Sequence, residues 1–201
     1  VMTQLQEGLI SKTGDLFYAF RFLKLLVTPF NKTKAFELGI LDKDGKNLKK
    51  AKTLKTPEEK SAYTVFHRLV FNIKRLLEKL PFGKSRLASY ATALFLIREH
   101  TGLSERKIKK IMSEVLDDMD WDMIEESSWF TSDNNLNPGS YVLLNDVVSL
   151  NTGEVIARKN SRIKVNDFTK PYATIFGHNI YEVYHPLTNQ NLYINNGDIT
   201  R

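Results

Sequence analysis

Residues 56–100 read TPEEKSAYTVFHRLVFNIKRLLEKLPFGKSRLASYATALFLIREH. Apolar residues recur at spacings of three and four through the first half of this stretch, which places them on one face of a helix. They are Ala62, Phe66, Leu69, Ile73, Leu76 and Leu80. Thr56 and Glu59 have the spacing of a capping box, and Pro57 suits a first helical turn. The pattern therefore predicts one continuous helix that starts at this cap.

A second helix is expected after the turn at residues 81–83, which contains proline and glycine. Its apolar stripe lies within residues 87–97, where several small side chains allow a neighbouring helix to approach closely. We therefore expect two antiparallel helices joined by a short polar turn. On the first of them, Lys74, Arg75 and Lys79 fall on the predicted polar side.

Composition limits the classes of protein to which this chain can belong. Its 201 residues suit one domain or two small ones, and a hydrophobic content of 42% is enough for a core. The chain has no cysteine, which excludes disulfides, thiolate metal sites and a cysteine nucleophile. No apolar run reaches the length of about 18 residues typical of a membrane span, and no secretory leader is recognisable. We expect an intracellular protein without a membrane partner.

Charge is distributed unevenly along the chain, although the net charge is only +6. Residues 1–112 carry 23 Lys and Arg against 10 Asp and Glu, whereas residues 113–138 carry 8 acidic residues and no basic ones. Residues 139–201 are nearly balanced, with 6 basic and 5 acidic residues. A basic body beside an acidic tract indicates polyanion contact or charge-matched self-association, and a solvated surface is the alternative.

Residues 16–27 read LFYAFRFLKLLV and are apolar on nearly every side of a helix. A helix of this kind is usually buried, and an amphipathic membrane anchor would show a cleaner polar face. We expect a core helix or a helix at a subunit interface. The candidate interface residues are Phe17, Phe20 and Leu23.

Residues 46–55 contain five lysines with no aromatic residue among them. Such a run is usually solvated, but lysines can also neutralise phosphates of a nucleic acid. Lys49, Lys50 and Lys52 are therefore candidate nucleic-acid contacts.

Residues 100–111 read HTGLSERKIKKI. Gly102 ends one helix and Ser104 caps the next. The pattern resembles the helix-turn-helix family, with apolar residues at the positions that this family buries: Ile97, Leu103, Ile108 and Ile111. It departs from the family at Arg98, where close helix crossing requires a small residue.

The helix-turn-helix resemblance implies a second helix that faces DNA. The residues on that face would be Ser104, Glu105, Arg106, Lys107 and Lys110, with the basic ones mostly on phosphates. With Lys109, the basic residues Arg106, Lys107 and Lys110 are the candidate nucleic-acid contacts of this helix. The alternative is a capped third helix of a bundle.

Residues 113–138 combine clustered carboxylates with aromatic side chains, and the sequence SDNNLNPG marks a boundary. Clustered carboxylates can bind Mg²⁺, but a two-metal nuclease draws its ligands from several ordered elements. We expect an acidic tract with Trp121 and Trp129 as aromatic anchors. The predicted organisation is a basic helical domain with this acidic tract at residues 1–130, a linker at residues 131–138 and a third segment at residues 139–201.

Residues 139–201 alternate short strand-like runs with turns rich in Asn, Gly and Thr. Five or six short strands in so few residues are typical of a small barrel. The pattern resembles the SH3-like barrel class, whose members bind peptides, nucleic acids or neighbouring subunits. We expect an α+β protein, with an all-α helical bundle followed by this SH3-like β-barrel. Tyr181 and Tyr184 are candidate interface residues.

The blocks at residues 20–50, 58–100 and 179–199 resemble a conserved protein family of large tailed bacteriophages associated with capsid assembly or the inner head. The sequence Leu5-Gln6-Glu7 before Gly8 is similar to a prohead-protease cleavage site. The resemblance implies a phage protein of the virion or the host cytoplasm with other virion proteins as partners, and it implies no active site.

Three functional readings follow from these observations. The first is a non-enzymatic bacteriophage structural or assembly protein that self-associates, binds virion proteins and has DNA as a further candidate partner. The alternative is a nucleic-acid-binding regulator that uses residues 87–112 as a helix-turn-helix reader. The third is a Mg²⁺-dependent nuclease, which no nucleophile–base pair or phosphate loop supports. We expect no enzyme, no cofactor and no small-molecule substrate.

Overall fold

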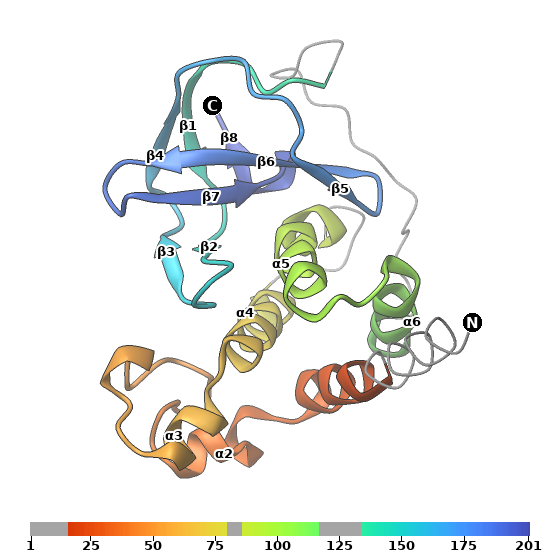
Figure 1. Cartoon of the computed structure of the whole chain (residues 1–201), viewed down its shortest axis with the longest axis vertical. Helices are drawn as coiled ribbons and strands as arrows, with labels where there is room; N and C mark the ends of the chain where they lie inside the picture. The colour runs from red at the N-terminus through yellow and green to blue at the C-terminus, as the bar shows by residue number, and fades with distance from the viewer. Residues whose placement is uncertain (1–15, 80–85, 117–133) are drawn as a thin grey trace, which may run out of the picture.

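The computed structural model of the chain describes residues 16–79, 86–116 and 134–201 (Figure 1). Helices form the first two of these ranges and short antiparallel strands form the last. The predicted α+β class is confirmed. Figure 1 shows the strands stacked above α4 and α5, with the N-terminal helical segments farther below.

The helical part begins with a helix at residues 16–27, red in Figure 1. The elements that follow are η1 (Phe30–Lys32), α2 (Lys34–Glu37), η2 (Ala51–Thr53), α3 (Pro57–Ala62), α4 (Val65–Lys79), α5 (Arg86–Thr101) and α6 (Glu105–Val115). α4 and α5 form the predicted hairpin. Its buried side chains include Leu69 and Ile73 of α4 and Ala91, Leu94 and Phe95 of α5.

The helix predicted to start at Thr56 is in fact two helices. The capping box is formed, because Thr56 Oγ1 accepts from the Glu59 backbone N–H at 3.1 Å and Glu59 Oε2 accepts from that of Thr56 at 3.2 Å. However, α3 ends at Ala62, and the next residue, Tyr63, has a non-helical backbone with φ −140° and ψ 53°. The Tyr63 ring is 2% exposed, stacks on Phe71 and donates from its hydroxyl to Asn47 Oδ1. This buried ring replaces a continuous helical turn, so apolar spacing alone gave the wrong helix length.

Lys74 and Arg75 do not lie on a solvated polar face as predicted. Lys74 is 5% exposed, and its amine donates to the Leu25 and Thr28 carbonyl groups near the end of the first helix. Arg75 donates to the Gly45 carbonyl group. Because neighbouring segments surround α4 on most sides, even its cationic side chains are drawn into contacts with backbone. The side chain of Lys79 lies outside the described part of the structure.

The C-terminal part consists of short antiparallel strands. They are β1 (Gly139–Leu143), β2 (Val147–Val148), β3 (Val155–Ala157), β4 (Arg162–Val165), β5 (Ala173–Ile175), β6 (His178–His185), β7 (Gln190–Ile194) and β8 (Ile199–Thr200), with η3 (Asn196–Asp198) before the last. They pair in the orders β4-β1-β8, β2-β3 and β5-β6-β7. The hydrogen-bonded pairs among the described residues do not close these sheets into one ring, so the structure establishes small antiparallel sheets.

The helical and strand parts share a hydrophobic core. Ile175 and Ile180 of the β5–β6 hairpin belong to the same buried cluster as Phe95 and Ile97 of α5. A second cluster lies among the strands, and a third lies around Phe30 and the segments that follow it. The division at residues 131–138 stays a prediction, since residues 117–133 lie outside the described ranges. The shared core nevertheless fixes the strands directly against α5.

Candidate functional site

The turn and the capped helix predicted after α5 are present. Gly102 has a φ of +71°, a backbone conformation that favours glycine at this turn. Leu103 and Ile108 are 1% and 0% exposed, and Ser104 Oγ accepts from the Lys107 backbone N–H at 3.3 Å. The apolar positions are therefore buried, as both the helix-turn-helix resemblance and a capped third helix of a bundle would have them, and DNA binding remains a prediction.

Arg98 joins α5 to both α6 and β5. Its Nη1 atom lies 2.9 Å from Glu105 Oε1 in the first turn of α6, and the same atom donates to the Thr174 carbonyl group at 2.8 Å. The residue that departs from the helix-turn-helix pattern is thus a bridge between helices and strands. Glu105, predicted to face DNA, is held in this ion pair.

The remaining basic residues of α6 form the outer side of this helix. Arg106 and Lys110 are exposed, and Lys107 and Lys109 are half-buried. Arg106, Lys107 and Lys110 form no ion pair with any acidic residue in the part of the chain that the structure describes. Their charges are therefore available to a polyanion. We refer to Arg106, Lys107, Lys109 and Lys110 as the α6 basic face.

Lys49, Lys50 and Lys52 lie away from the α6 basic face. Lys49 is an internal contact, because its amine lies 2.8 Å from Glu59 Oε1 and donates to the Leu38 carbonyl group. The hydrogen bond from Lys49, with those from two backbone N–H groups, lowers the pKa of Glu59 to about 2. Lys50 and Lys52 are exposed beside η2. Figure 1 shows this orange segment and α6 on opposite sides of the helical part, so the two basic groups do not form one surface.

The first helix buries one side and exposes the other. Phe22 is fully buried in the shared core, whereas Phe17 and Phe20 are 56% and 68% exposed. Leu23, the third predicted interface residue, is partly buried against the core. The core reading is therefore confirmed for one side of the helix, and the interface reading stays a prediction for the other. We call Leu16, Phe17, Phe20 and Val27 the exposed apolar face; sequence analysis identified only Phe17 and Phe20 among them.

The two tyrosines predicted to lie at an interface have opposite environments. Tyr181 is 1% exposed and its hydroxyl donates to the Asn134 carbonyl group, so this tyrosine belongs to the strand core and the prediction was wrong. Burial raises the pKa of Tyr181 to about 12. Tyr184 is 56% exposed and donates to Asn189 Oδ1 at 2.6 Å. Trp121 and Trp129 lie outside the described residues.

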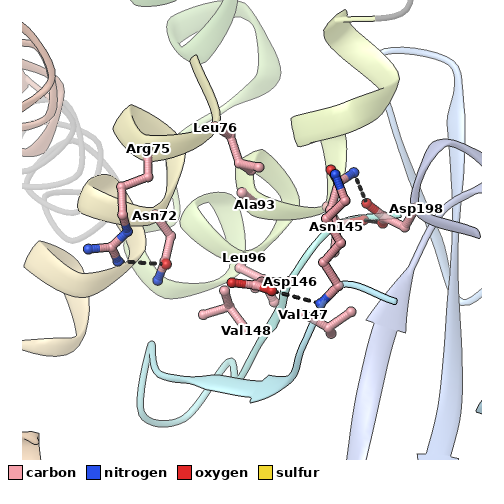
Figure 2. A pocket seen from close by; sticks show the side chains of 12 residues that line it. Asn72, Arg75, Leu76, Ala93, Leu96, Asn145, Asp146, Val147, Val148 and Asp198 are labelled. Carbon is pink, nitrogen blue, oxygen red and sulfur yellow. Dashed lines mark hydrogen bonds between the residues drawn. The ribbon is translucent and has the colours of Figure 1, made fainter. Parts of the chain in front are cut away.

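A cavity of about 180 Å³ lies between α4, α5 and the loop from β1 to β2 (Figure 2). Figure 2 shows Arg75 and Asn72 at one side of the cavity and Asn145 and Asp198 at the other. Sequence analysis missed the cavity, because its lining comes from five separate segments and no local motif marks it. Arg75 on α4 was the available signal, but its place in the apolar pattern put it on the predicted polar side.

Asp198 is a buried carboxylate with several donors around it. Oδ2 accepts from Thr92 Oγ1 at 2.5 Å and from the Asn195 backbone N–H at 3.0 Å, and Oδ1 accepts from Asn145 Nδ2 at 3.3 Å. Burial nevertheless raises the pKa of Asp198 to about 6. This carboxylate connects α5, the β1–β2 loop and η3.

Arg75 has a different set of partners at the opposite side of the cavity. Its Nη2 atom donates to Asn72 Oδ1 at 2.7 Å, and burial lowers the pKa of its guanidinium group. Asp146 acts on this group electrostatically, yet no carboxylate among the described residues forms an ion pair with it. Asp146 Oδ1 accepts instead from the Lys159 backbone N–H at 2.7 Å.

The described residues contain no cluster of three or more His, Cys, Asp or Glu side chains suited to a metal ion. The acidic tract considered for Mg²⁺ lies largely in residues 117–133, outside the described ranges. Among the described helices, none has the length and apolar character needed to cross a bilayer.

Comparisons of the chain with protein-family models, with curated proteins and with solved structures found no match.

Proposed function

We propose that this protein is a non-enzymatic structural or assembly protein of a large tailed bacteriophage. It self-associates through the exposed apolar face of its first helix and binds other virion proteins. The observation that carries the proposal is this face, in which four large apolar side chains are each more than half exposed. The sequence resemblance to a phage family supplies the context.

The arrangement of the exposed apolar face supports a protein partner. Leu16, Phe20 and Val27 are spaced by four and seven residues, so they lie along one side of the helix. Contiguous exposed apolar groups of this kind mark interaction surfaces. Fully burying one such side chain contributes about 1.5–3 kcal/mol, so the four together can stabilise an association.

The oligomeric state of the protein tests this proposal. Sedimentation velocity across a concentration series should show an oligomer that dissociates on dilution. Phe17→Ser combined with Phe20→Ser should shift the protein to monomer, because both substitutions remove apolar area from the exposed face. Leu187→Ser is the matched control, since this leucine is 90% exposed in the loop between β6 and β7. A monomer at every concentration, with the same profile for all three proteins, would contradict the proposal.

The strand part serves as a docking module in this proposal, with the SH3-like barrel as its proposed class. The β5-β6-β7 sheet and the exposed Tyr184 and Phe168 support this role, because they combine a fixed framework with apolar groups on the surface. Loops on a rigid framework are common binding elements.

DNA is a further proposed partner, through the α6 basic face. Cations on one side of a helix can neutralise phosphates without reading sequence. The alternative function, a helix-turn-helix regulator, is favoured by the packing of α5 and α6. The contacts of Arg98 with Glu105 and Thr174 count against a regulator. They hold the first turn of α6, which would have to face DNA, beside β5.

A further inference from the structure

Arg75 lines the cavity between α4, α5 and the β1–β2 loop as a cation that is in no ion pair within the described part of the chain. The Arg75 guanidinium group has five N–H donors, and its hydrogen bonds go to Gly45 O and Asn72 Oδ1, both neutral acceptors. Within the described part of the chain, no acidic side chain forms an ion pair with it. Arg75 is half-buried, so its guanidinium group loses part of its solvation, and an anionic group at this end of the cavity would stabilise its charge.

Asp146 provides the opposite charge nearby. Its carboxylate affects Arg75 electrostatically but is not in an ion pair with it, and one carboxylate oxygen accepts from the Lys159 backbone N–H at 2.7 Å. In Figure 2, Asp146 lies between the Arg75 side and the Asp198 side of the cavity. A ligand with both charges close together would match this pair.

The rest of the lining is mixed. Its apolar side chains are Leu76, Ala93, Leu96, Val147 and Val148, and its polar ones are Asn72, Thr92, Asn145, Lys159 and Asp198. The cavity volume is about 180 Å³. An engineered apolar cavity of about 150 Å³ accepts benzene, so there is room here for a short branched aliphatic chain whose polar head lies at Arg75 and Asp146. This size fits a short aliphatic chain with a small polar head.

We propose that this cavity binds a small aliphatic zwitterion of the free amino-acid class. The ligand carboxylate contacts Arg75, the ligand ammonium group contacts Asp146, and the aliphatic chain lies against Leu96 and Val148. Selectivity arises from the need for both charges at once, because a ligand with one charge leaves the other protein group unpaired. This inference is independent of the proposed assembly role.

L-Leucine is the ligand for the first experiment, measured by isothermal titration calorimetry and by thermal unfolding of the full chain. A ligand that binds only the folded state raises the melting temperature progressively with its concentration. 4-Methylpentanoate and 3-methylbutylamine are matched controls, since each keeps the aliphatic chain and lacks one charge. We expect each control to bind at least about tenfold more weakly than leucine. Equal effects of all three compounds, or no binding of leucine up to about 10 mM, would overturn the proposal.

Three variants test whether the cavity is the site. Arg75→Gln and Asp146→Asn each remove one charge, and Ala93→Leu fills the cavity with an apolar side chain. All three should lose leucine binding, while Arg162→Gln on the exposed side of β4 should retain it. Circular dichroism identifies variants that fold. A folded Ala93→Leu protein that binds leucine with unchanged affinity would show that the cavity is not the site.

Discussion

Gly153 lies where the turn between β2 and β3 approaches α4. Its φ is +67°, and a Cβ atom added there would lie 2.8 Å from the Val65 carbonyl oxygen and 2.9 Å from Arg68 Cβ. Asn72 Nδ2 also donates to the Gly153 carbonyl group at 3.0 Å. Gly39 has a similar φ of +66° but no atom within 4 Å of an added Cβ. The two glycines therefore separate backbone strain from steric exclusion.

Gly153→Ala should destabilise the protein more than Gly39→Ala. The left-handed backbone conformation costs alanine about 1–2 kcal/mol at either position, and the clash with α4 adds about 1–3 kcal/mol at Gly153 alone. Urea unfolding monitored by circular dichroism measures both free energies. Equal losses of unfolding free energy for the two variants would mean that the β2–β3 turn has room for a Cβ atom beside α4.

Asp198 should make stability depend on pH between about 4 and 6. The pKa of this carboxyl group is raised from 3.8 to about 6 in the folded protein, so the folded state holds its proton more tightly than the unfolded state. Its favourable contribution is fully present below the unfolded pKa and is lost as pH rises through about 6, with a limit of about 3 kcal/mol.

Unfolding free energies at pH 7.5 and pH 5 should show this effect as a difference between proteins. Acidification should stabilise the wild type relative to Asp198→Asn, which has no carboxyl group to titrate. Asp167→Asn, at an exposed position, is the control and should follow the wild type. If the unfolding free energies of wild type and Asp198→Asn changed equally with pH, burial would not be raising the pKa of Asp198.

Residue types alone predicted some positions and not others. The cap at Thr56 and the turn at Gly102 depend on neighbours in the sequence, and both were predicted correctly. Tyr181 and Tyr184 lie on the same strand with similar neighbours, yet one is buried and the other is exposed. Their environments depend on which sheet or helix covers each side of β6, and that information lies in segments far away in the chain.

At the scale of elements, periodicity located the α4–α5 hairpin but not the environment of its polar residues. A helix with an apolar stripe is expected to have one solvated side. α4 instead contacts the first helix through Lys74 and the β2–β3 turn through Arg68 and Asn72. Lysine and arginine have long apolar stems that can be buried, so their presence in a helix does not identify a solvated side.

Arg106→Glu combined with Lys110→Glu should weaken binding to duplex DNA. Both cations are exposed on α6, and each phosphate contact that is lost reduces the dependence of affinity on salt by about one unit of slope. Fluorescence anisotropy at several salt concentrations would measure a fall in affinity and a slope lower by about 2.

Lys50→Glu combined with Lys52→Glu provides the matched control for α6. It reverses the same number of charges on the opposite side of the helical part, where Figure 1 places the η2 segment. This control should leave the affinity much closer to that of the wild type. If the two double variants lose equal affinity, net charge and not α6 is responsible. A strong preference for one duplex sequence would instead favour the regulator.

At the scale of the whole molecule, the protein should be a component of virus particles. Mass spectrometry of purified particles should detect this chain at a stoichiometric copy number, with an N-terminus at Gly8 if a prohead protease removes the preceding residues. A similarly abundant non-structural phage protein serves as the contamination control. Absence from particles, with abundance in infected cells, would favour a scaffold lost on maturation or the regulator.

The sequence predicted the order of helices and strands but not how the two parts meet. Their contact depends on a shared core and on single polar bridges such as Arg98 to Thr174, which are 76 positions apart. The cavity at this junction was missed for the same reason. Patterns of nearby residues report local structure, whereas a junction is determined by side chains that only the folded chain brings together.

Arg68, Lys74 and Arg75 of α4 donate hydrogen bonds to uncharged partners, and this affects how the structure responds to acid. Arg68 donates to the Tyr63 and Thr152 carbonyl groups, Lys74 to that of Thr28, and Arg75 to a carbonyl group and an amide. A carboxylate partner loses its charge in acid, but a carbonyl group does not titrate. These hydrogen bonds should therefore persist at an acidic pH at which protonation of the carboxylate breaks ordinary salt bridges.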